Sequence, residues 1–383
     1  VEVFRTAPPE NTAPARRAFL SVAENDPSGT SEAVTVLASL PENFQAANAA
    51  QVAIASLVMT HPDRVEAVTS PLLDAIESDD EDTRNYAFNA LASLAETRPS
   101  ELLPEAIPVL RPKLAAENST VQSAALAVTA EIARQRPAAV APATPELLDI
   151  VATQREFDTG EEYYAELPDQ LRSRLAAAET RIIRARMVAA LTLVEIGRVD
   201  ADAGVTALDT LLGSLSEETN LTVREATYDL AWLIGQQRPA AVESAVSQLA
   251  ERLHSEDDDE IQGKVARALG ILADECDARV VSAVSTAAPT LRDLLHSDAS
   301  VAVAGSVGLL SYVAERRPEA VEPAVPKLLE LADDGPTYVR GNAIWTLSFV
   351  GGDAAAETLA DIATSATDER IRAIATEAHQ RLD

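Results

Sequence analysis

The stretch RPEAVEPAVPKLLELADDGPTYVRGNAIWTLSFV, residues 317–350, contains the pattern that decides the fold. Apolar residues recur three or four positions apart at Val321, Val325 and Leu328, which predicts an amphipathic α-helix. A short polar turn follows, and a second apolar run begins at Val339. The stretch therefore predicts two helices joined by a turn, which we name helix A and helix B.

The Arg-Pro dipeptide that opens this stretch recurs along the chain. It stands at Arg98-Pro99, Arg136-Pro137, Arg238-Pro239 and Arg317-Pro318, with His61-Pro62 as a variant. Successive prolines are 37, 38, 102 and 79 residues apart. The last spacing is two periods of about 39 residues, and the spacing of 102 is two periods with an excess of about 24. The chain is therefore an array of helical pairs with one interruption.

Other copies show the same organisation within the period. Helix B carries an apolar stripe at Ala87, Ala90, Leu91 and Leu94, and it closes before the next Arg-Pro. No segment shows a sustained period of two with β-branched residues, so no sheet is expected. The predicted fold class is all-α.

Local signals refine the helix ends. A hydroxyl residue before a valine, as at Thr120, Thr222 and Ser300, predicts the N-cap of helix B. A second proline five residues after the first, as at Pro142 and Pro323, predicts that helix A is kinked or starts late.

The pairs resemble HEAT repeats. The resemblance is carried by the period, by the early prolines and by the dipeptides Val223-Arg224, Val339-Arg340 and Ile371-Arg372. It covers roughly residues 30 to 380, in about eight or nine copies, and it implies a right-handed α-α superhelix of the HEAT/armadillo type, which would be an elongated array.

In that family an acidic residue of the turn and the arginine form a ladder between neighbouring repeats. Glu218 with Arg224 and Asp334 with Arg340 match this spacing. Gln122 and Gln262 stand in place of the arginine in two copies, so the ladder is expected to be interrupted there. The family also implies protein-protein scaffolding, with rarer members that bind nucleic acid or act as enzymes.

The whole chain, 1–383, is predicted to be a single HEAT-repeat array. We expect an N-terminal cap and first repeat in 1–60, regular repeats in 61–152, an insertion in 153–178, regular repeats in 179–350 and a C-terminal capping repeat in 351–383.

The insertion gathers aromatic residues in a chain that has few. Phe157, Tyr163 and Tyr164 lie in REFDTGEEYYAELPD, which we interpret as a long turn followed by an extended helix B from about Pro168. Exposed loop aromatics often anchor protein partners, so these three are candidate partner-binding residues. The alternative is that they fold back onto the flank of the array.

The two tryptophans are expected to have a different role. Trp232 and Trp345 lie within B helices, where packing in the core is expected.

The charge is strongly negative. The chain has 61 acidic and 31 basic residues, for a net charge of -30. Nucleic acid would be repelled by this charge. Only three of the basic residues are lysines, and acidity with lysine depletion suggests a salt-adapted organism, the alternative being an ordinary acidic protein.

Catalytic motifs are missing from the sequence. It has no phosphate-binding loop, dinucleotide fingerprint, Cys-x-x-Cys, nucleophile elbow or His-Glu dipeptide. The acidic runs at 79–82 and 257–260 lack the spacing of a calcium loop and are interpreted as solvated turns. We therefore expect no enzyme activity, no cofactor and no metal site.

The location and assembly are predicted from weaker signals. No apolar run reaches the roughly 18 residues of a membrane span, and residues 1–40 lack a signal-peptide layout. The single cysteine, Cys276, excludes an internal disulfide and suits a reducing cytosol. A cytoplasmic monomer is expected.

The leading hypothesis is a protein-protein interaction scaffold whose partner the sequence does not identify. A second hypothesis is a chromosome-associated or DNA-processing HEAT protein, which would need a line of arginines such as Arg181, Arg184, Arg186 and Arg267. A third is an enzyme on a HEAT frame, such as a base glycosylase or a bilin lyase.

Overall fold

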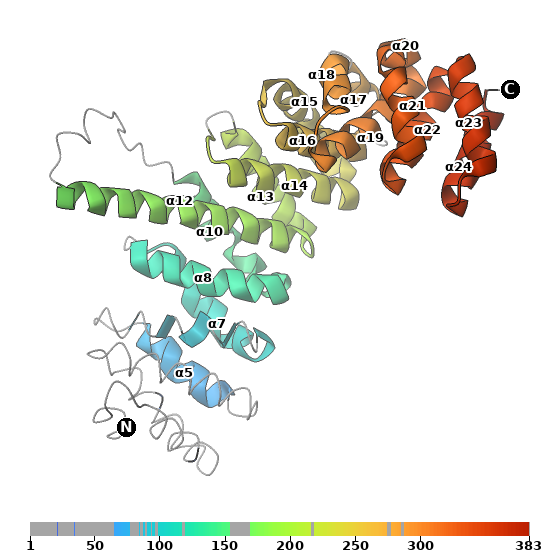
Figure 1. Ribbon diagram of the computed structural model, residues 1–383. Coiled ribbons are helices and arrows are strands. Elements are labelled where there is room, and N and C mark those ends of the chain that lie inside the picture. Colours follow the sequence, from blue (N-terminus) through green and yellow to red (C-terminus); the bar gives the residue numbers. More distant parts are fainter. Residues whose placement is uncertain are drawn as a thin grey trace. The chain divides into compact units, whose positions relative to one another are not determined.

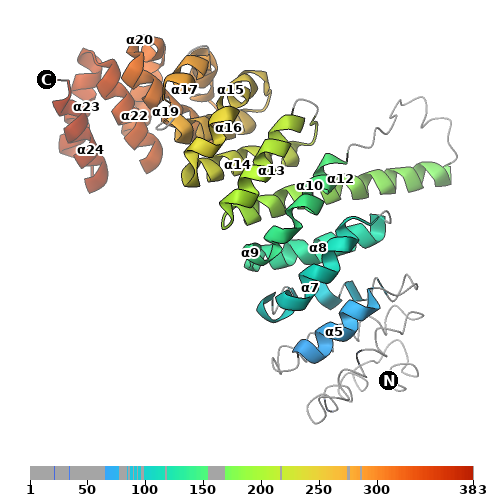
Figure 2. The same cartoon turned by 180° about the vertical axis from the view of Figure 1, so that it is seen from behind.

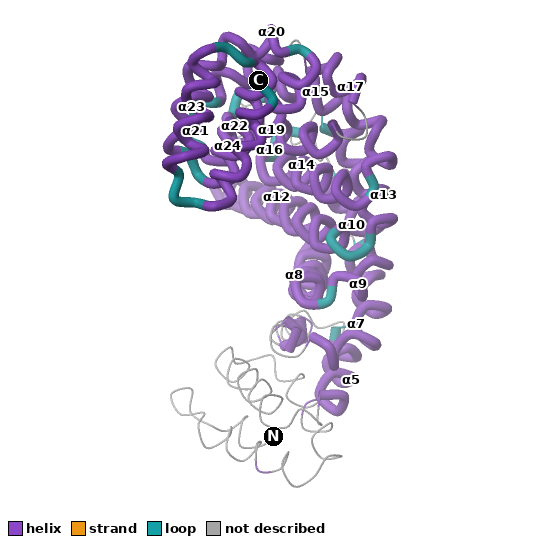
Figure 3. The backbone as a smooth tube through the Cα atoms, turned by 90° about the vertical axis from the view of Figure 1, so that its right-hand side faces the viewer, coloured by secondary structure: helices purple, strands orange, loops and turns teal. Residues whose placement is uncertain are grey.

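The described part of the chain consists of helices joined by short turns, with no strand among the described residues (Figure 1, Figure 3). The computed structural model describes Ser21, Val34, 65–76, most of 84–95, 99–116, 119–153, 169–215, 218–273, 277–284 and 287–382. Within these ranges no helix combines the length and the hydropathy that a membrane crossing requires. The predicted all-α solenoid is confirmed.

The chain divides into two compact units, Val1–Ala203 and Gly204–Asp383. The helices of the first unit are α5 (Val65–Ala75), α7 (Pro99–Leu114), α8 (Ser119–Gln135), α9 (Pro137–Val140), α10 (Thr144–Ala152) and α12 (Asp169–Gly197). Here α7 packs on α8, and α10 packs on α12. The B helices α8 and α12 also pack on each other (Figure 1, Figure 2).

The second unit repeats this arrangement. After α13 (Ala201–Ser214), which begins at the unit boundary, its helices are α14 (Leu221–Gln237), α15 (Val246–Ser255), α16 (Asp259–Ala273), α17 (Asp277–Val284), α18 (Ala288–Leu294), α19 (Ser300–Arg316), α20 (Pro318–Val321), α21 (Val325–Asp334), α22 (Thr337–Val350), α23 (Asp353–Ser365) and α24 (Glu369–Gln380). The B helices α14, α16, α19, α22 and α24 pack in succession, each on the next.

The Arg-Pro dipeptides end the B helices as predicted. Arg136, Arg238 and Arg317 have nearly the same backbone, with φ between -140° and -146° and ψ between 61° and 69°. A residue before proline is pushed out of the α region, whereas proline is tolerated in the first turn of the next helix. The dipeptide therefore stops helix B and starts helix A at the same place.

In two repeats helix A is interrupted where a second proline follows. Short 3₁₀ segments at Ala141–Ala143 and Glu322–Ala324 contain Pro142 and Pro323 and separate α9 from α10 and α20 from α21. The 3₁₀ segment Pro239–Ala245 lacks a second proline. In α7, however, the helix runs unbroken from Pro99 to Leu114 through a second proline, Pro104, so the prediction of a late start is wrong there. A second proline is therefore neither required nor sufficient for the break.

The N-caps of the B helices lie earlier than predicted. The cap of α14 is Asn220, whose side chain accepts from the amide of Val223 at 3.1 Å, and Asp368 caps α24 in the same way. The residue before α19 is Ala299, with no side-chain cap bond. Thr222 and Ser300 are therefore not caps, because the cap position lies two residues before Thr222, at Asn220, and one residue before Ser300, at Ala299.

Two glycines allow α16 and α19 to approach closely. A Cβ at Gly305 would overlap the carbonyl oxygen of Gly263, and a Cβ at Gly263 would lie 2.5 Å from the Cα of Ala302. Any side chain at either position would separate the two helices. These backbones touch only because both residues are glycine.

Candidate functional site

A polar residue that directly follows an apolar one has a shared structural role in the B helices α8, α12, α16, α22 and α24. In several pairs its side chain donates to a carbonyl at the end of helix A. These bonds join Gln122 to Leu114 (2.9 Å), Arg186 to Val151 (2.9 Å), Gln262 to Leu253 (3.2 Å), Arg340 to Ala332 (3.1 Å) and Arg372 to Ala366 (2.7 Å). The last carbonyls of a helix lack helical partners, so these bonds satisfy them. Glutamine does this as well as arginine, and Gln122 and Gln262 do not interrupt the pattern.

Arg224, at the same position in α14, is bound differently. Its Nη1 donates to Glu256, the C-cap residue of α15 in the following pair. The hydroxyl of Tyr228 donates to the other carboxylate oxygen of Glu256 at 2.6 Å, and Glu256 is only 3% exposed. Burial, together with the hydrogen bond and the charge of Glu256, raises the pKa of Tyr228. This network links two neighbouring pairs.

The structure gives both arginines of the expected ladder partners other than those predicted. Arg224 binds Glu256, while Glu218 accepts from the backbone amide of Asn220 at 2.7 Å. Arg340 donates to Ala332 within its own pair, and Asp334 is exposed at the end of α21. The ladder of Glu218, Arg224, Asp334 and Arg340 therefore stays a prediction.

The insertion is described only in part. Phe157, Tyr163 and Tyr164 lie outside the described residues, so their role as partner-binding residues also stays a prediction. The helix that follows begins at Asp169, which agrees with an extended helix B from about Pro168. Because α12 runs for 29 residues, its first turns extend beyond the length of the other B helices.

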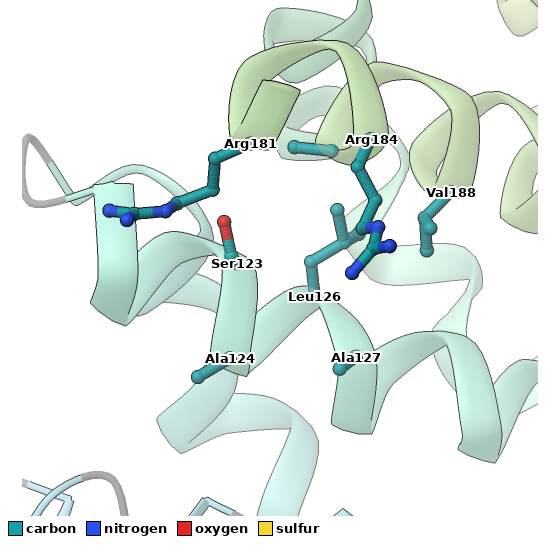
Figure 4. A pocket seen from close by; sticks show the side chains of 8 residues that line it. Ser123, Ala124, Leu126, Ala127, Arg181, Arg184 and Val188 are labelled. Carbon is teal, nitrogen blue, oxygen red and sulfur yellow. The ribbon is translucent and has the colours of Figure 1, made fainter. Parts of the chain in front are cut away.

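A hollow of about 400 Å³ lies between α8 and α12. Its lining consists of Ser123, Ala124, Leu126, Ala127, Arg181, Arg184, Ala185 and Val188. Figure 4 shows Arg184 reaching from α12 toward α8, with Arg181 at the other end of the hollow. The floor is apolar and the cationic groups all come from α12.

The hollow exists because α8 carries alanine where other B helices carry large side chains. Counted from the first apolar residue of each B helix, Ala127 of α8 stands where Asp229, Arg267 and Trp345 stand in α14, α16 and α22. Ala127 is exposed and Ala124 is half-buried. A methyl group cannot fill the space that a longer side chain covers.

The two arginines give the hollow a local positive charge. Arg181 Nη1 donates to the hydroxyl of Ser119 at 3.2 Å. Arg184 is exposed and has no hydrogen bond or ion pair with any residue that the structure describes. The sequence of α12 contains five arginines against three acidic residues, in a chain whose net charge is -30. The hollow is therefore a cationic site in an acidic protein.

The basic residues on α16 differ because they are neutralised. Lys264 and Arg267 bind the carboxylate of Asp229 at 2.8 Å and 2.5 Å. Arg267 also lies 4.4 Å from the ring centroid of Trp232. Trp232 is consequently half-buried under a guanidinium, and the expectation that it packs in the core is wrong.

Trp345 is also half-buried, so the same correction applies to it. It stacks on Phe349 with ring centroids 6.5 Å apart, and the guanidinium of Arg381 lies 5.5 Å from its centroid. The two tryptophans therefore lie on the surface of the B helices, each beside an arginine of the next B helix.

The four arginines proposed for a DNA-binding line do not act together. Arg186 donates to Val151 and Arg267 binds Asp229, so only Arg181 and Arg184 border the hollow. Tight phosphate binding uses several cations at once, each releasing a counterion. The described residues therefore do not bring the four arginines together into one line of cations.

The described lining of the hollow suits the binding of an anion. Among the described residues that line it, Ser123 supplies the one side-chain hydroxyl, and none is a histidine or a carboxylate that could act as a base. In the described ranges no group of three or more histidine, cysteine or acidic side chains is placed to hold a metal. Guanidinium groups over an apolar floor suit the binding of carboxylates.

The comparisons with known proteins agree with the helical pairs. Residues 288–380 match the family model described as HEAT repeats, which confirms the predicted repeat type for that segment. No curated protein matches the sequence.

Two solved structures show how the chain compares with designed repeats. An engineered protein is 21% identical over 63% of this chain and 98% of its own, with a TM-score of 0.47. A designed armadillo repeat protein in complex with the peptide (KR)4 is 16% identical over 63% of this chain and 99% of its own, with a TM-score of 0.46.

Proposed function

We propose that this chain is a non-catalytic scaffold that binds a protein partner, and that the hollow between α8 and α12 belongs to the binding surface. The observation that carries the proposal is Arg184, an exposed guanidinium without a described partner beside an apolar floor. Because Arg184 forms no hydrogen bond or ion pair with a described residue, it contributes no such bond to the described fold. Its placement beside the exposed Ala127 and the half-buried Ala124 is typical of a surface that a partner completes.

The repeat architecture supports the same proposal. A helical pair cannot bury its apolar face alone, so pairs stack and leave a continuous surface of B helices open to solvent. Such surfaces suit long protein segments. Repeat solenoids are typically interaction scaffolds, and the residues that line the hollow offer no general base for catalysis.

The experiment that tests this function is site-specific photocrosslinking in cells of the source organism. A photoreactive amino acid replaces Ala127 in the hollow or, as a control, Asp149, which is exposed on helix A of the neighbouring pair. We expect a discrete protein adduct from position 127 and none from position 149. Absence of a protein adduct at position 127, or equal adducts at both positions, would contradict the proposal.

A further inference from the structure

We infer that the hollow between α8 and α12 takes an acidic segment of the partner, in which an apolar side chain stands close to a carboxylate. This inference rests on the proposed function and names the chemistry of the ligand. It follows from the cations, from the floor and from the range over which charges act.

The cations select carboxylates. Arg184 presents a guanidinium that no described residue neutralises, whereas Arg181 already has partners, the hydroxyl of Ser119 among them. A guanidinium binds a carboxylate through two parallel hydrogen bonds, and such charge-assisted bonds are stronger than neutral ones. Arg184 can therefore bind an acidic side chain of a partner segment.

The floor selects an apolar side chain. Ala124, Ala127 and Val188 leave an apolar surface with room above it. The apolar surface continues along α12, because Leu191 follows Val188 by one turn and is 50% exposed. Burying this surface under a leucine-sized side chain is favourable, whereas a purely acidic segment would leave it in water.

The range of electrostatic forces explains how an acidic chain can bind an acidic segment. Exposed charges are screened over about 8 Å at physiological ionic strength. The two arginines therefore determine the potential inside the hollow, while the net charge of -30 acts on long polyanions that extend beyond it. A short acidic segment is favoured over nucleic acid.

A random peptide library displayed on phage tests this inference on the full chain. Peptides are selected on the parent protein and depleted on Arg184→Glu. The matched control is Arg370→Glu, because Arg370 is also exposed and also precedes the first buried residue of its B helix, α24. Both variants change exposed residues, and equal melting temperatures would show that they fold alike.

We expect the selected peptides to be acidic, with an apolar residue close to an acidic one. As labelled synthetic peptides, they should bind Arg184→Glu about tenfold more weakly or worse, a loss of at least about 1.4 kcal/mol, and bind Arg370→Glu within about twofold. Ala127→Leu, which fills the space above the apolar floor, should also weaken the binding of these peptides.

The other outcomes separate the inference from the proposed function. Basic or uncharged peptides that depend on Arg184 would overturn the acidic chemistry while leaving a binding scaffold. Selected peptides that are indifferent to Arg184→Glu would place binding elsewhere on the scaffold. A labelled duplex DNA that binds the parent and is lost in Arg184→Glu would assign the hollow to nucleic acid. No selected peptide at all would contradict both proposals.

Discussion

The pair of B helices α8 and α12 differs from the pair α14 and α16 in how its basic side chains are satisfied. On α16, Lys264 and Arg267 are bound by Asp229, and Arg267 covers Trp232. On α12, Arg184 faces alanines and has no described partner. The charges between α14 and α16 thus bind one another, whereas the charge of Arg184 on α12 is available to a partner. Ala127 stands where α14 has Asp229, and Val188 and Leu191 of α12 stand where α16 has Lys264 and Arg267, so the ion pairs of the second surface have no counterpart in the first.

The largest expected effect is on the network that links two pairs of the second unit. Glu256→Ala would leave the guanidinium of Arg224 and the buried hydroxyl of Tyr228 without their acceptor. Removing one partner of a buried charge pair costs about 3 to 5 kcal/mol. We expect a loss of about 3 kcal/mol in urea unfolding. Glu251→Ala, at an exposed position on α15, should change stability by less than about 0.5 kcal/mol, and equal effects of the two would contradict the network.

Substitution by alanine should change stability in opposite directions at two helical glycines, because only one of them lies where α16 and α19 approach closely. In Gly305→Ala the new methyl would overlap the carbonyl of Gly263, and such overpacking costs about 1 to 3 kcal/mol. In Gly213→Ala the methyl would meet nothing within 4 Å, and the change should stabilise by about 0.5 to 1 kcal/mol. Thermal melting measures both. A stabilising Gly305→Ala would show that the helices are not in contact there.

The buried Tyr228 predicts that the free energy of unfolding depends on pH. The pKa of Tyr228 is raised in the folded protein above its ordinary value of 10.0, so above pH 10 the unfolded chain releases a proton that the folded chain keeps. Stability from this group is present below pH 10 and falls as the pH rises, by about 1.4 kcal/mol per pH unit. Tyr228→Phe should remove this slope from urea unfolding between pH 9 and pH 11, and an unchanged slope would contradict the prediction.

The local features of the fold were readable from the sequence because they depend on neighbours along the chain. The prolines after Arg136, Arg238 and Arg317 fix the backbone of the preceding residue, whatever lies across from it. Local residues also predicted the late start of the regular helix α21 and the extended helix that begins at Asp169.

The site could not be predicted in full, since it depends on residues far apart in the chain. The sequence singled out Arg181, Arg184, Arg186 and Arg267 equally. What separates them is contact across helices: Val151 accepts from Arg186, and Asp229 binds Arg267. Trp232 was assigned to the core because the sequence did not show that an arginine of α16 covers it. A signal for the hollow was present in Ala127 of α8, at a position where α14, α16 and α22 carry Asp229, Arg267 and Trp345.

The smallest expected effect compares the two surfaces directly. Asp229→Asn removes the charge that neutralises Lys264 and Arg267, and half-exposed pairs contribute up to about 1 kcal/mol. Arg184→Ala removes a group with no described partner, so it should change stability by less than about 0.5 kcal/mol. Urea unfolding of both variants should therefore show a loss only for Asp229→Asn. A loss at Arg184 of the same size would mean that this arginine serves the fold.

The central claim, that Arg184 is kept free for a carboxylate of the partner, is tested most directly by a double-mutant cycle. One arm is Arg184→Ala, the other replaces each acidic residue of a selected peptide by its amide, and the affinities of all combinations are measured. The account predicts a coupling free energy of about 1.5 kcal/mol or more between Arg184 and one carboxylate of the peptide, and none between Arg267 and any of them. Additive losses at Arg184, or coupling to Arg267 instead, would contradict it.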